Sequence, residues 1–373
     1  RRQRQMCIRD RHTEMTTNTL KFFTLLRFPL MVGVVMIHCD ISDQLVPELR
    51  GQWAQDVMYF FSNIIGRFSV PMFFLISGFL FYRNGTLTHN EYASKLHHRL
   101  YTLLIPYLLW NLIAFLFFIA KHYPPLCPVF QGITEIPISF ENFLKSFWEF
   151  RFEGLGESKS MPIDFPLWYV RDLMIVVLCS PLLYRLIKCG RLLVGLIGGI
   201  WLSFNPEFCG IDMTGFFFFT LGGYFSMNKV DLADIFKSRK AKISTMFLFV
   251  IVIIADMITR GETYHYLLHN ITILTGMIVM FICADLILRL SIGKSTILIE
   301  HFASTTFFVY ALHGLFVAPL RKGLCLALQP TSNTVAVMTY MLSILTTIIL
   351  SLITYYVLKK LCPQFCSLLN GGR

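Results

Sequence analysis

The stretch that decides the fold runs from Leu20 to Cys39 and reads LKFFTLLRFPLMVGVVMIHC. It is almost wholly apolar and long enough to cross a bilayer, which takes about 20 residues of helix. Past Lys21 at its start, two basic side chains interrupt it, Arg27 and His38. A helix turns by about 100° and rises by about 1.5 Å per residue, so their spacing places both side chains on nearly one face, roughly 16 Å apart.

Charged groups inside lipid are costly and usually face a cavity or a partner, so this face is a candidate functional site. A structural interpretation is open beside it. An ion pair between packed helices would explain Arg27, and a position at the membrane boundary would explain His38.

Composition places the chain among membrane proteins. Of its 373 residues, 55% are hydrophobic and only 15% are charged. Soluble domains carry about 25% charged residues, so the sequence predicts an all-α, polytopic membrane protein. The net charge of +11 comes from basic residues in short connections between apolar runs, which the positive-inside rule explains. No nucleic-acid partner is expected, and no metal site, because Cys362 and Cys366 lack nearby His or further Cys.

Ten apolar runs are candidate spans: 20–39, 57–82, 101–120, 166–187, 192–208, 211–227, 243–259, 264–288, 303–320 and 334–358. With a cytoplasmic N-terminus, most of the Lys and Arg residues fall in cytoplasmic segments, and removing the fifth span destroys this asymmetry. We therefore predict about ten transmembrane helices with both termini cytoplasmic. The expected regions are a cytoplasmic tail at 1–19, a membrane domain at 20–360 and a second cytoplasmic tail at 361–373.

One long outer connection, 121–165, contains the segment SFENFLKSFWEFRF at 139–152. Its aromatic residues follow helical spacing, with Glu141 and Lys145 on the other face. The pattern predicts an amphipathic helix on the outer surface, which either anchors the loop or covers a site.

Several polar residues lie within or near the ends of other apolar runs. Arg67 lies in the middle of the second run. Arg171 and Asp172 are adjacent in the fourth, where neighbouring helical residues point about 100° apart, so we expect at least one to reach another helix instead of both neutralising each other. Asp256 and Asp285 lie near span ends and are expected to be interfacial carboxylates.

The ninth run carries a polar stripe, because Thr306, Tyr310 and His313 recur at helical spacing. A hydrogen-bonded packing histidine is the alternative interpretation of His313.

Arginine, ten residues and then histidine in the first membrane helix resembles the signature of the acyltransferase 3 family of integral membrane acyltransferases. Further stretches resemble the family in the same order: VPMFFLISGFLFY at 70–82, HHRLYTLLIPYLLW at 97–110, FPLWYVRDLMIVVLCSPL at 165–182 and TFFVYALHGLF at 306–316. The family often has a second arginine three residues after the position of Arg99, and here that position is Thr102. Some relatives carry an appended soluble esterase-like domain, which is not expected in this chain.

The resemblance implies transfer of an acyl group, with acetyl expected, from cytoplasmic acyl-CoA to a hydroxyl of a cell-surface or envelope glycan. Acyl-CoA is then a donor substrate, no permanently bound cofactor is expected, and the location is the cytoplasmic (inner) cell membrane. Imidazole titrates near neutral pH, so His38 is the expected catalytic group, either as general base or as the acylated residue. The expected CoA-binding residues are Arg27 and Arg99. Further candidate site-lining residues are Arg67, Trp168, Tyr169, Arg171, Asp172, Tyr310 and His313.

Two other functions compete with acyl transfer. A secondary transporter or glycan flippase would also use many spans and buried charges, although no inverted repeat with paired broken helices is visible. A non-catalytic membrane scaffold would not need several ionisable groups at membrane depth. The sequence leaves the acyl group, the acceptor glycan and the oligomeric state open.

Overall fold

The computed structural model describes the backbone of residues 2–121, 123, 139–149, 161–208, 210–230, 232, 238–290 and 294–372, and their side chains except those of 2–18, 288–290 and 294–300. The described chain is almost wholly helical, with one short antiparallel pair, β1 (Glu207–Phe208) and β2 (Ile211–Asp212).

The α-helices are α1 (Arg2–His38), α2 (Trp53–Tyr59), α3 (Ser69–Phe81), α4 (His89–Arg99), α5 (Ile105–Ala120), α6 (Phe140–Lys145), α7 (Trp168–Leu178), α8 (Ser180–Cys189), α9 (Arg191–Ser203), α10 (Met213–Met227), α11 (Arg239–Ile258), α12 (His265–Leu290), α13 (Lys294–Leu328), α14 (Asn333–Leu361) and α15 (Pro363–Leu369). Shorter helical turns are η1 (Ser42–Gln44), η2 (Pro47–Leu49), η3 (Phe60–Ile65), η4 (Leu100–Leu104) and η5 (Phe165–Leu167).

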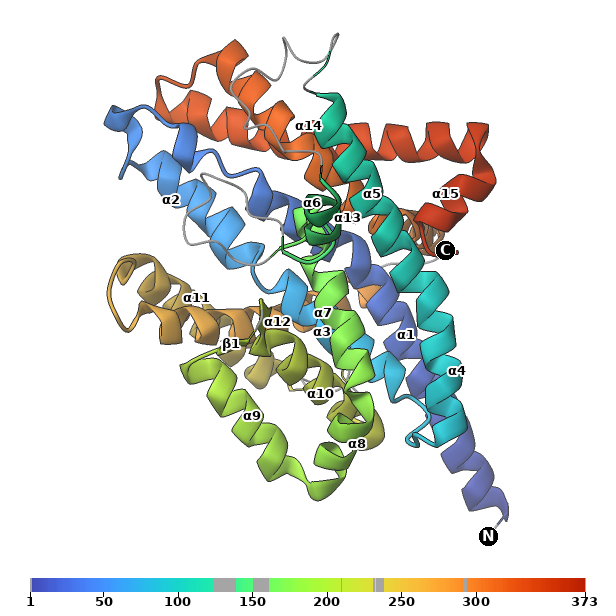
Figure 1. Ribbon diagram of the computed structural model, residues 1–373. Helices are drawn as coiled ribbons and strands as arrows, with labels where there is room; N and C mark the ends of the chain where they lie inside the picture. The colour runs from blue at the N-terminus through green and yellow to red at the C-terminus, as the bar shows by residue number, and fades with distance from the viewer. Residues whose placement is uncertain are drawn as a thin grey trace.

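Helix α1 is the central element of the fold (Figure 1). It packs against α3, α13 and α14, and its apolar side chains Phe22, Leu30 and Val35 are fully buried. The stretch from Leu20 to Cys39 is therefore surrounded by protein along much of its length, which fixes Arg27 and His38 relative to the other helices.

Helices α3 and α10 cross in backbone contact. A Cβ on Gly78 would lie 1.9 Å from the carbonyl oxygen of Phe219, and one on Gly222 would lie 2.0 Å from that of Leu75. Any larger residue at either glycine would separate the two helices. Close packing through small residues is typical of membrane helices, because lipid offers no hydrophobic drive for their association.

Seven helical stretches of the described chain are long and apolar enough to span a membrane: Thr19–Gln44, Trp53–Phe81, His89–Ala120, Arg239–Ile258, His265–Ile287, His301–Leu328 and Asn333–Leu361. The bent pair α8–α9 would make eight if it were one span. The helical, polytopic membrane fold is thus confirmed. The count of ten is not confirmed, and the cytoplasmic placement of both termini stays a prediction.

The predicted and observed numbers of spans differ because of residues 166–227, where three predicted spans form short helices. The first divides into α7 and α8 at Cys179. Helices α8 and α9 meet at 118°, and Gly190 at the bend has a φ of +118°, which glycine adopts far more readily than other residues. Helix α10 has only 15 residues, many of them buried. Hydropathy alone does not distinguish a helix buried in protein from one that crosses lipid.

The predicted amphipathic helix at 139–152 is also shorter than expected. Helix α6 covers Phe140–Lys145, and residues 150–152 lie outside the described part of the chain. Phe140 is exposed, whereas Phe143 packs edge-on against Phe115 with ring centroids 5.4 Å apart. The Tyr107 hydroxyl donates a hydrogen bond to the carbonyl of Phe147 just after the helix. The segment is thus anchored to α5, the helix that carries Tyr107 and Phe115.

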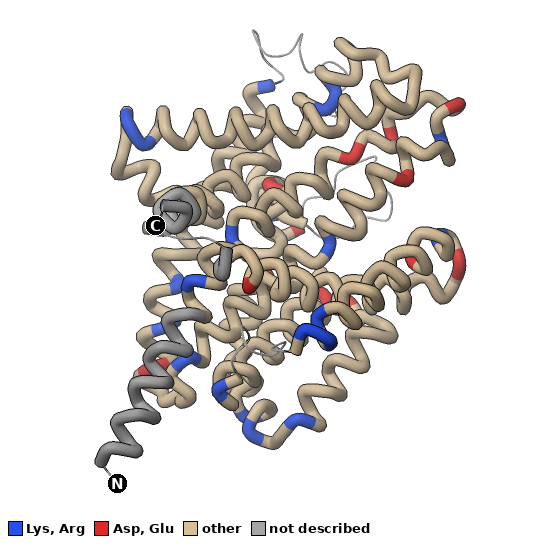
Figure 2. Tube along the Cα trace, turned by 180° about the vertical axis from the view of Figure 1, so that it is seen from behind, with Lys and Arg blue, Asp and Glu red and all other residues tan. Residues whose placement is uncertain are grey.

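Charged residues are unevenly distributed over the molecule. Figure 2 shows many Lys and Arg residues around the end from which α1 emerges, whereas most Asp and Glu residues lie toward the other end. By the positive-inside rule a cytoplasmic N-terminus would put the basic end inside, and this orientation stays a prediction.

Candidate active site

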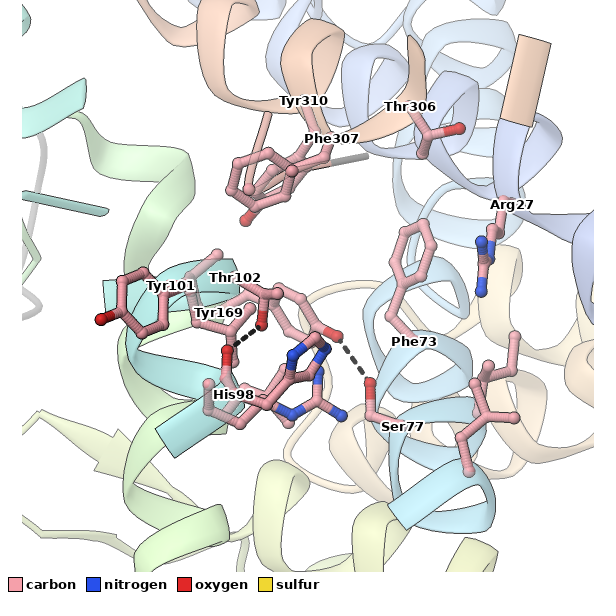
Figure 3. A pocket seen from close by; sticks show the side chains of 18 of the residues that line it. Arg27, Phe73, Ser77, His98, Tyr101, Thr102, Tyr169, Thr306, Phe307 and Tyr310 are labelled. Atoms are coloured by element: carbon pink, nitrogen blue, oxygen red, sulfur yellow. Dashed lines mark hydrogen bonds between the residues drawn. The ribbon is translucent and has the colours of Figure 1, made fainter. Parts of the chain in front are cut away.

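A cavity of about 650 Å³ lies among α1, α3, α4, α7, α13 and α15 (Figure 3). Its volume falls within the range of about 300–1,000 Å³ that is common for small-molecule sites. The polar lining residues are Arg27, Ser77, His98, Arg99, Tyr101, Thr102, Tyr169, Thr306, Tyr310, Gln364 and Ser367. The apolar wall includes Phe73, Leu103, Leu173 and Phe307.

Two arginines that are distant in sequence line this cavity together. Arg27 comes from α1 and Arg99 from the last turn of α4, with His98 beside it. None of the lining residues that the structure describes is acidic. A positively charged cavity with partly apolar walls suits an anionic ligand that also has an apolar or amide-containing portion, because guanidinium groups bind phosphate by several directed hydrogen bonds.

Thr102, where the family often has a second arginine, faces the C-terminal segment. Its hydroxyl donates to the carbonyl of His98 at 3.1 Å, and its own carbonyl would lie 2.6 Å from a Cβ on Gly371. Gly371 has a φ of +67° and itself lines the cavity. In this chain the C-terminal backbone therefore packs directly against Thr102.

Two tyrosines lie deeper in the cavity. The hydroxyl of Tyr169 is 3.2 Å from that of Ser77, and the ring of Tyr169 meets that of Tyr310 edge-on at 6.1 Å (Figure 3). Tyr310 donates its hydroxyl hydrogen to the carbonyl of Pro166, which joins α13 to the turn before α7. Both tyrosines were expected site residues, and the structure places them on one wall with Arg27 and Arg99.

His38 lies next to this wall, although it does not line the cavity itself. Its ring centroid is 5.5 Å from that of His313, and it meets Phe165 edge-on at 4.7 Å. His313 is fully buried and its Nδ1 faces the carbonyl of Tyr310, so Nδ1 carries the hydrogen and Nε2 is left as an acceptor. Within the described residues, His313 Nε2 is buried without a hydrogen-bond partner. The contacts of the His38 ring are those with Phe165 and His313. The histidine pair is therefore held by packing.

Asp164 is a buried carboxylate that the sequence analysis did not single out. It is 1% exposed, and neither carboxylate oxygen has a hydrogen-bond partner among the described residues. A Cβ on Gly314 would lie 2.4 Å from its Oδ1, so the carboxylate lies against α13 at Gly314. Burial raises the pKa of Asp164, which precedes α7 outside the candidate spans, well above its usual value. A single Asp in a long connection gives no sequence signal, because most such residues are solvated.

Arg67 lies near the other face of His38. A Cβ on Gly66 would lie 2.7 Å from both the carbonyl of Gly33 and a side-chain carbon of Ile37, so the turn that carries Arg67 touches α1 next to His38. The Asn63 amide oxygen accepts hydrogen bonds from Arg67 Nε and Nη2 at 3.3 and 3.1 Å. This guanidinium is exposed and has no ion pair among the described residues.

Asp40 and Arg321 add to the polar region around His38, and the sequence analysis had placed neither there. Arg321 donates to the carbonyl of Asp40 and, at 3.0 Å, to the carboxylate of Asp43. The Asp40 carboxylate accepts from the Ser62 hydroxyl at 2.8 Å. The ninth predicted span ends at residue 320, whereas α13 continues to Leu328 and contains Arg321. The sequence does not show the contacts of Arg321 with Asp40 and Asp43, because they are tertiary.

Arg171 and Asp172 correct one expectation. They do pair with each other, with Nε donating to Oδ1 at 2.9 Å, and both are almost fully buried. Arg171 also donates to the carbonyls of Trp148, at 3.1 Å, and Gly210. It thus reaches two other segments, although these carbonyls lie after α6 and between β1 and β2 and not in a helix. The side chain of Arg171 is long enough to bend back to Asp172, although the two Cα–Cβ bonds point about 100° apart. Arg171, Asp172 and Trp168 lie outside the cavity lining, and Trp168 packs against the core.

Comparison with known proteins agrees with this geometry. A family model described as an acyltransferase domain matches residues 20–356, which is most of the chain. The chain belongs to the acyltransferase 3 family. It is 24% identical over 366 residues to the succinoglycan biosynthesis protein ExoH of Rhizobium meliloti (strain 1021), covering 96% of this chain and 94% of that protein. No solved structure matches. The family resemblance inferred from Arg27 and His38 is thus confirmed, and the chain is a membrane acyltransferase by family.

Proposed function

We propose that this protein transfers an acyl group, with acetyl as the first candidate, from cytoplasmic acyl-CoA to a hydroxyl of an exported or envelope glycan in the cytoplasmic membrane. The observation that supports this most is the order of groups along α1. Arg27 lines a cationic cavity, and further along the same helix His38 meets His313 beyond the tyrosine wall. Similarity to a succinoglycan biosynthesis protein supports a glycan as the acceptor.

In this proposal the cavity binds the donor. Arg27 and Arg99 hold the phosphates of CoA, because a planar guanidinium gives directed, charge-assisted bonds. The apolar wall at Phe73 and Phe307 accommodates the pantetheine arm. The thioester then points past Tyr169 and Tyr310 toward His38.

The chemical step needs little more than a base and a site for negative charge, because a thioester is already activated. His38 takes the proton of the acceptor hydroxyl while the hydroxyl oxygen attacks the thioester carbonyl. A carbon–oxygen bond forms and the carbon–sulfur bond breaks. His38 then returns the proton to the CoA thiolate, so the products are an ester and free CoA thiol. Acylation of His38 itself is the alternative route, which a burst of free thiol before glycan addition would reveal.

Arg67 is suited to stabilise the negative charge that develops on the thioester oxygen. Asn63 fixes its guanidinium and no carboxylate among the described residues neutralises it. A preoriented cation at such a position stabilises the transition state more than the ground state.

The test is direct assay of the purified protein with acyl-CoA and the glycan repeat unit. Free CoA thiol and an alkali-labile ester on the glycan are expected in equal amounts. Acetyl-CoA, longer acyl-CoA and dicarboxylic acyl-CoA compared side by side identify the donor. Absence of thiol release with all donors, combined with passage of unmodified glycan across a liposome membrane, would instead establish a transporter.

A further inference from the structure

A second cluster of ionisable residues lies at the joined ends of α11 and α12, the hairpin at the left of Figure 1. Asp256 comes from the last turn of α11, and His265 and His269 lie one turn apart on α12. One ligand atom of each of the three residues lies within 4.8 Å of the other two. The sequence predicted no metal site. These three residues come from two helices and form no recognisable motif, so the sequence does not reveal the cluster.

The acidic member of this cluster is deeply buried. Asp256 is 0% exposed, against the interfacial position expected from sequence, and its Oδ2 is 3.0 Å from Nδ1 of His269. Its Oδ1 accepts a hydrogen bond of 2.8 Å from the hydroxyl of Tyr59, a residue of α2. The imidazole of His269 is 19% exposed, so the cluster is accessible from one side.

The contact between Nε2 of His265 and the oxygen of Tyr59 has no hydrogen to share. The Thr259 hydroxyl donates to the carbonyl of Ala255 at 2.8 Å, so it accepts from Nδ1 of His265 at 3.3 Å. Nε2 of His265 is then a lone pair. It faces the oxygen of Tyr59 at 3.2 Å, and that hydroxyl already donates to Asp256. Two acceptors therefore face each other, which an additional positive centre between them would resolve.

The local charge also favours a cation. Arg260 is the nearest arginine to Tyr59, with its guanidinium 4.5 Å from the ring centre, but it forms an ion pair with Asp56. Among the described residues, the carboxylate of Asp256 meets the hydroxyl of Tyr59 and the imidazole of His269 but no Lys or Arg. An imidazole is neutral when it acts as a metal ligand. Thr259 fixes the tautomer that directs Nε2 of His265 inward, as residues behind metal-binding histidines commonly do.

We propose that Asp256, His265 and His269 form a site for a divalent transition metal of the Zn²⁺ class, with Tyr59 or water in the fourth position. Two imidazoles and a carboxylate are a donor set that Zn²⁺ prefers. Zn²⁺ bonds of about 2.1 Å in a tetrahedron bring ligand atoms to about 3.4 Å from one another, so the side chains need to approach only slightly. The metal joins α11 and α12 and holds their connected ends against α2.

The experiment measures metal content and stability of the purified full chain, independently of activity. Protein prepared with ZnCl₂ and passed through a desalting column should retain stoichiometric zinc. EDTA should then lower its melting temperature. Replacement by Co²⁺ should give the visible absorption of a tetrahedral or five-coordinate site. Thr259→Val should weaken Zn²⁺ binding about tenfold or more, because it removes the partner of His265 Nδ1.

Asp256→Asn, His265→Ala and His269→Ala should each lose the bound zinc and the effect of EDTA. His301→Ala is the matched control, because this exposed histidine bonds to Tyr356 on another part of the fold and should leave zinc binding unchanged. If a variant does not fold, zinc retention and the effect of EDTA on the melting temperature of the wild-type protein still test the proposal. Wild type that retains no zinc and whose melting temperature ignores EDTA would overturn the proposal in favour of a purely hydrogen-bonded cluster. Zinc retention by the three single variants equal to that of His301→Ala would do the same.

Discussion

The imidazole rings of His38 and His313 lie 5.5 Å apart, one on α1 and the other on α13. His313 is fully buried and its Nδ1 is committed to the carbonyl of Tyr310, whereas His38 is only partly buried and contacts the rings of Phe165 and His313. The two rings are thus equal in chemistry but not in surroundings. His38 is the one that can approach an acceptor hydroxyl, and His313 fixes its position by contact.

This asymmetry predicts different effects for changes at His313. His313→Ala should lower kcat by about tenfold to a hundredfold, by analogy with other supporting residues, because it leaves a cavity beside His38. His313→Gln keeps much of the volume and should recover part of the loss. Steady-state kinetics on both variants, with KM for acyl-CoA as a second readout, checks this; a higher KM with unchanged kcat would contradict a positioning role.

Arg27 tests whether the cavity binds phosphate by geometry or by charge alone. Arg27→Lys keeps the charge but loses the planar donor set, so acyl-CoA should bind about tenfold more weakly, and Arg27→Ala more weakly still. Equilibrium binding of a non-hydrolysable acyl-CoA analogue measures this. Equal affinity of the lysine variant and wild type would show that Arg27 supplies only charge.

Replacing Asp164 by Asn should raise the stability of the protein and lower its activity. Its carboxylate is buried without a hydrogen-bond partner among the described residues, and burial raises its pKa. Ionisation therefore favours the unfolded state above a pH of about 4, the usual carboxyl value. Asp164→Asn should therefore be more stable at neutral pH, by roughly 1–3 kcal/mol, with the advantage shrinking as the pH falls toward that value. Acyl transfer should fall, because the carboxylate lies against α13, the helix that carries Tyr310 and His313. Melting temperatures from pH 4 to 8 decide this, and a less stable Asn variant would disprove the stability argument.

Topology can be checked with two exposed lysines. The predicted orientation puts Lys145 outside and Lys240 inside. In intact cells, a membrane-impermeant thiol reagent should label Lys145→Cys and not Lys240→Cys, in a background whose native cysteines are replaced. The reverse pattern would invert the whole model of cytoplasmic donor and external acceptor.

Much of the fold follows from the sequence because apolar runs report helices directly. The runs at 166–227 show the limit, since burial in protein and burial in lipid demand the same side chains. Some residues of the candidate site could likewise be predicted from the sequence and others could not. Arg27 and His38 could be found because one helix carries both, whereas Asp164 meets α13 at Gly314 only through a tertiary contact. The pairing of Arg171 with Asp172 was missed because side-chain length, not the backbone angle, decides which groups meet.

The measurement that tests the account most directly is acyl transfer by His38→Ala, compared with wild type and with His301→Ala as control. The variant should fold and insert like wild type, because insertion depends on the apolar stretch around His38 rather than on its imidazole. It should bind acyl-CoA normally through Arg27 and Arg99, yet form no glycan ester and release no CoA thiol above background. A His38→Ala protein that acylates the glycan at the wild-type rate would contradict the proposed mechanism.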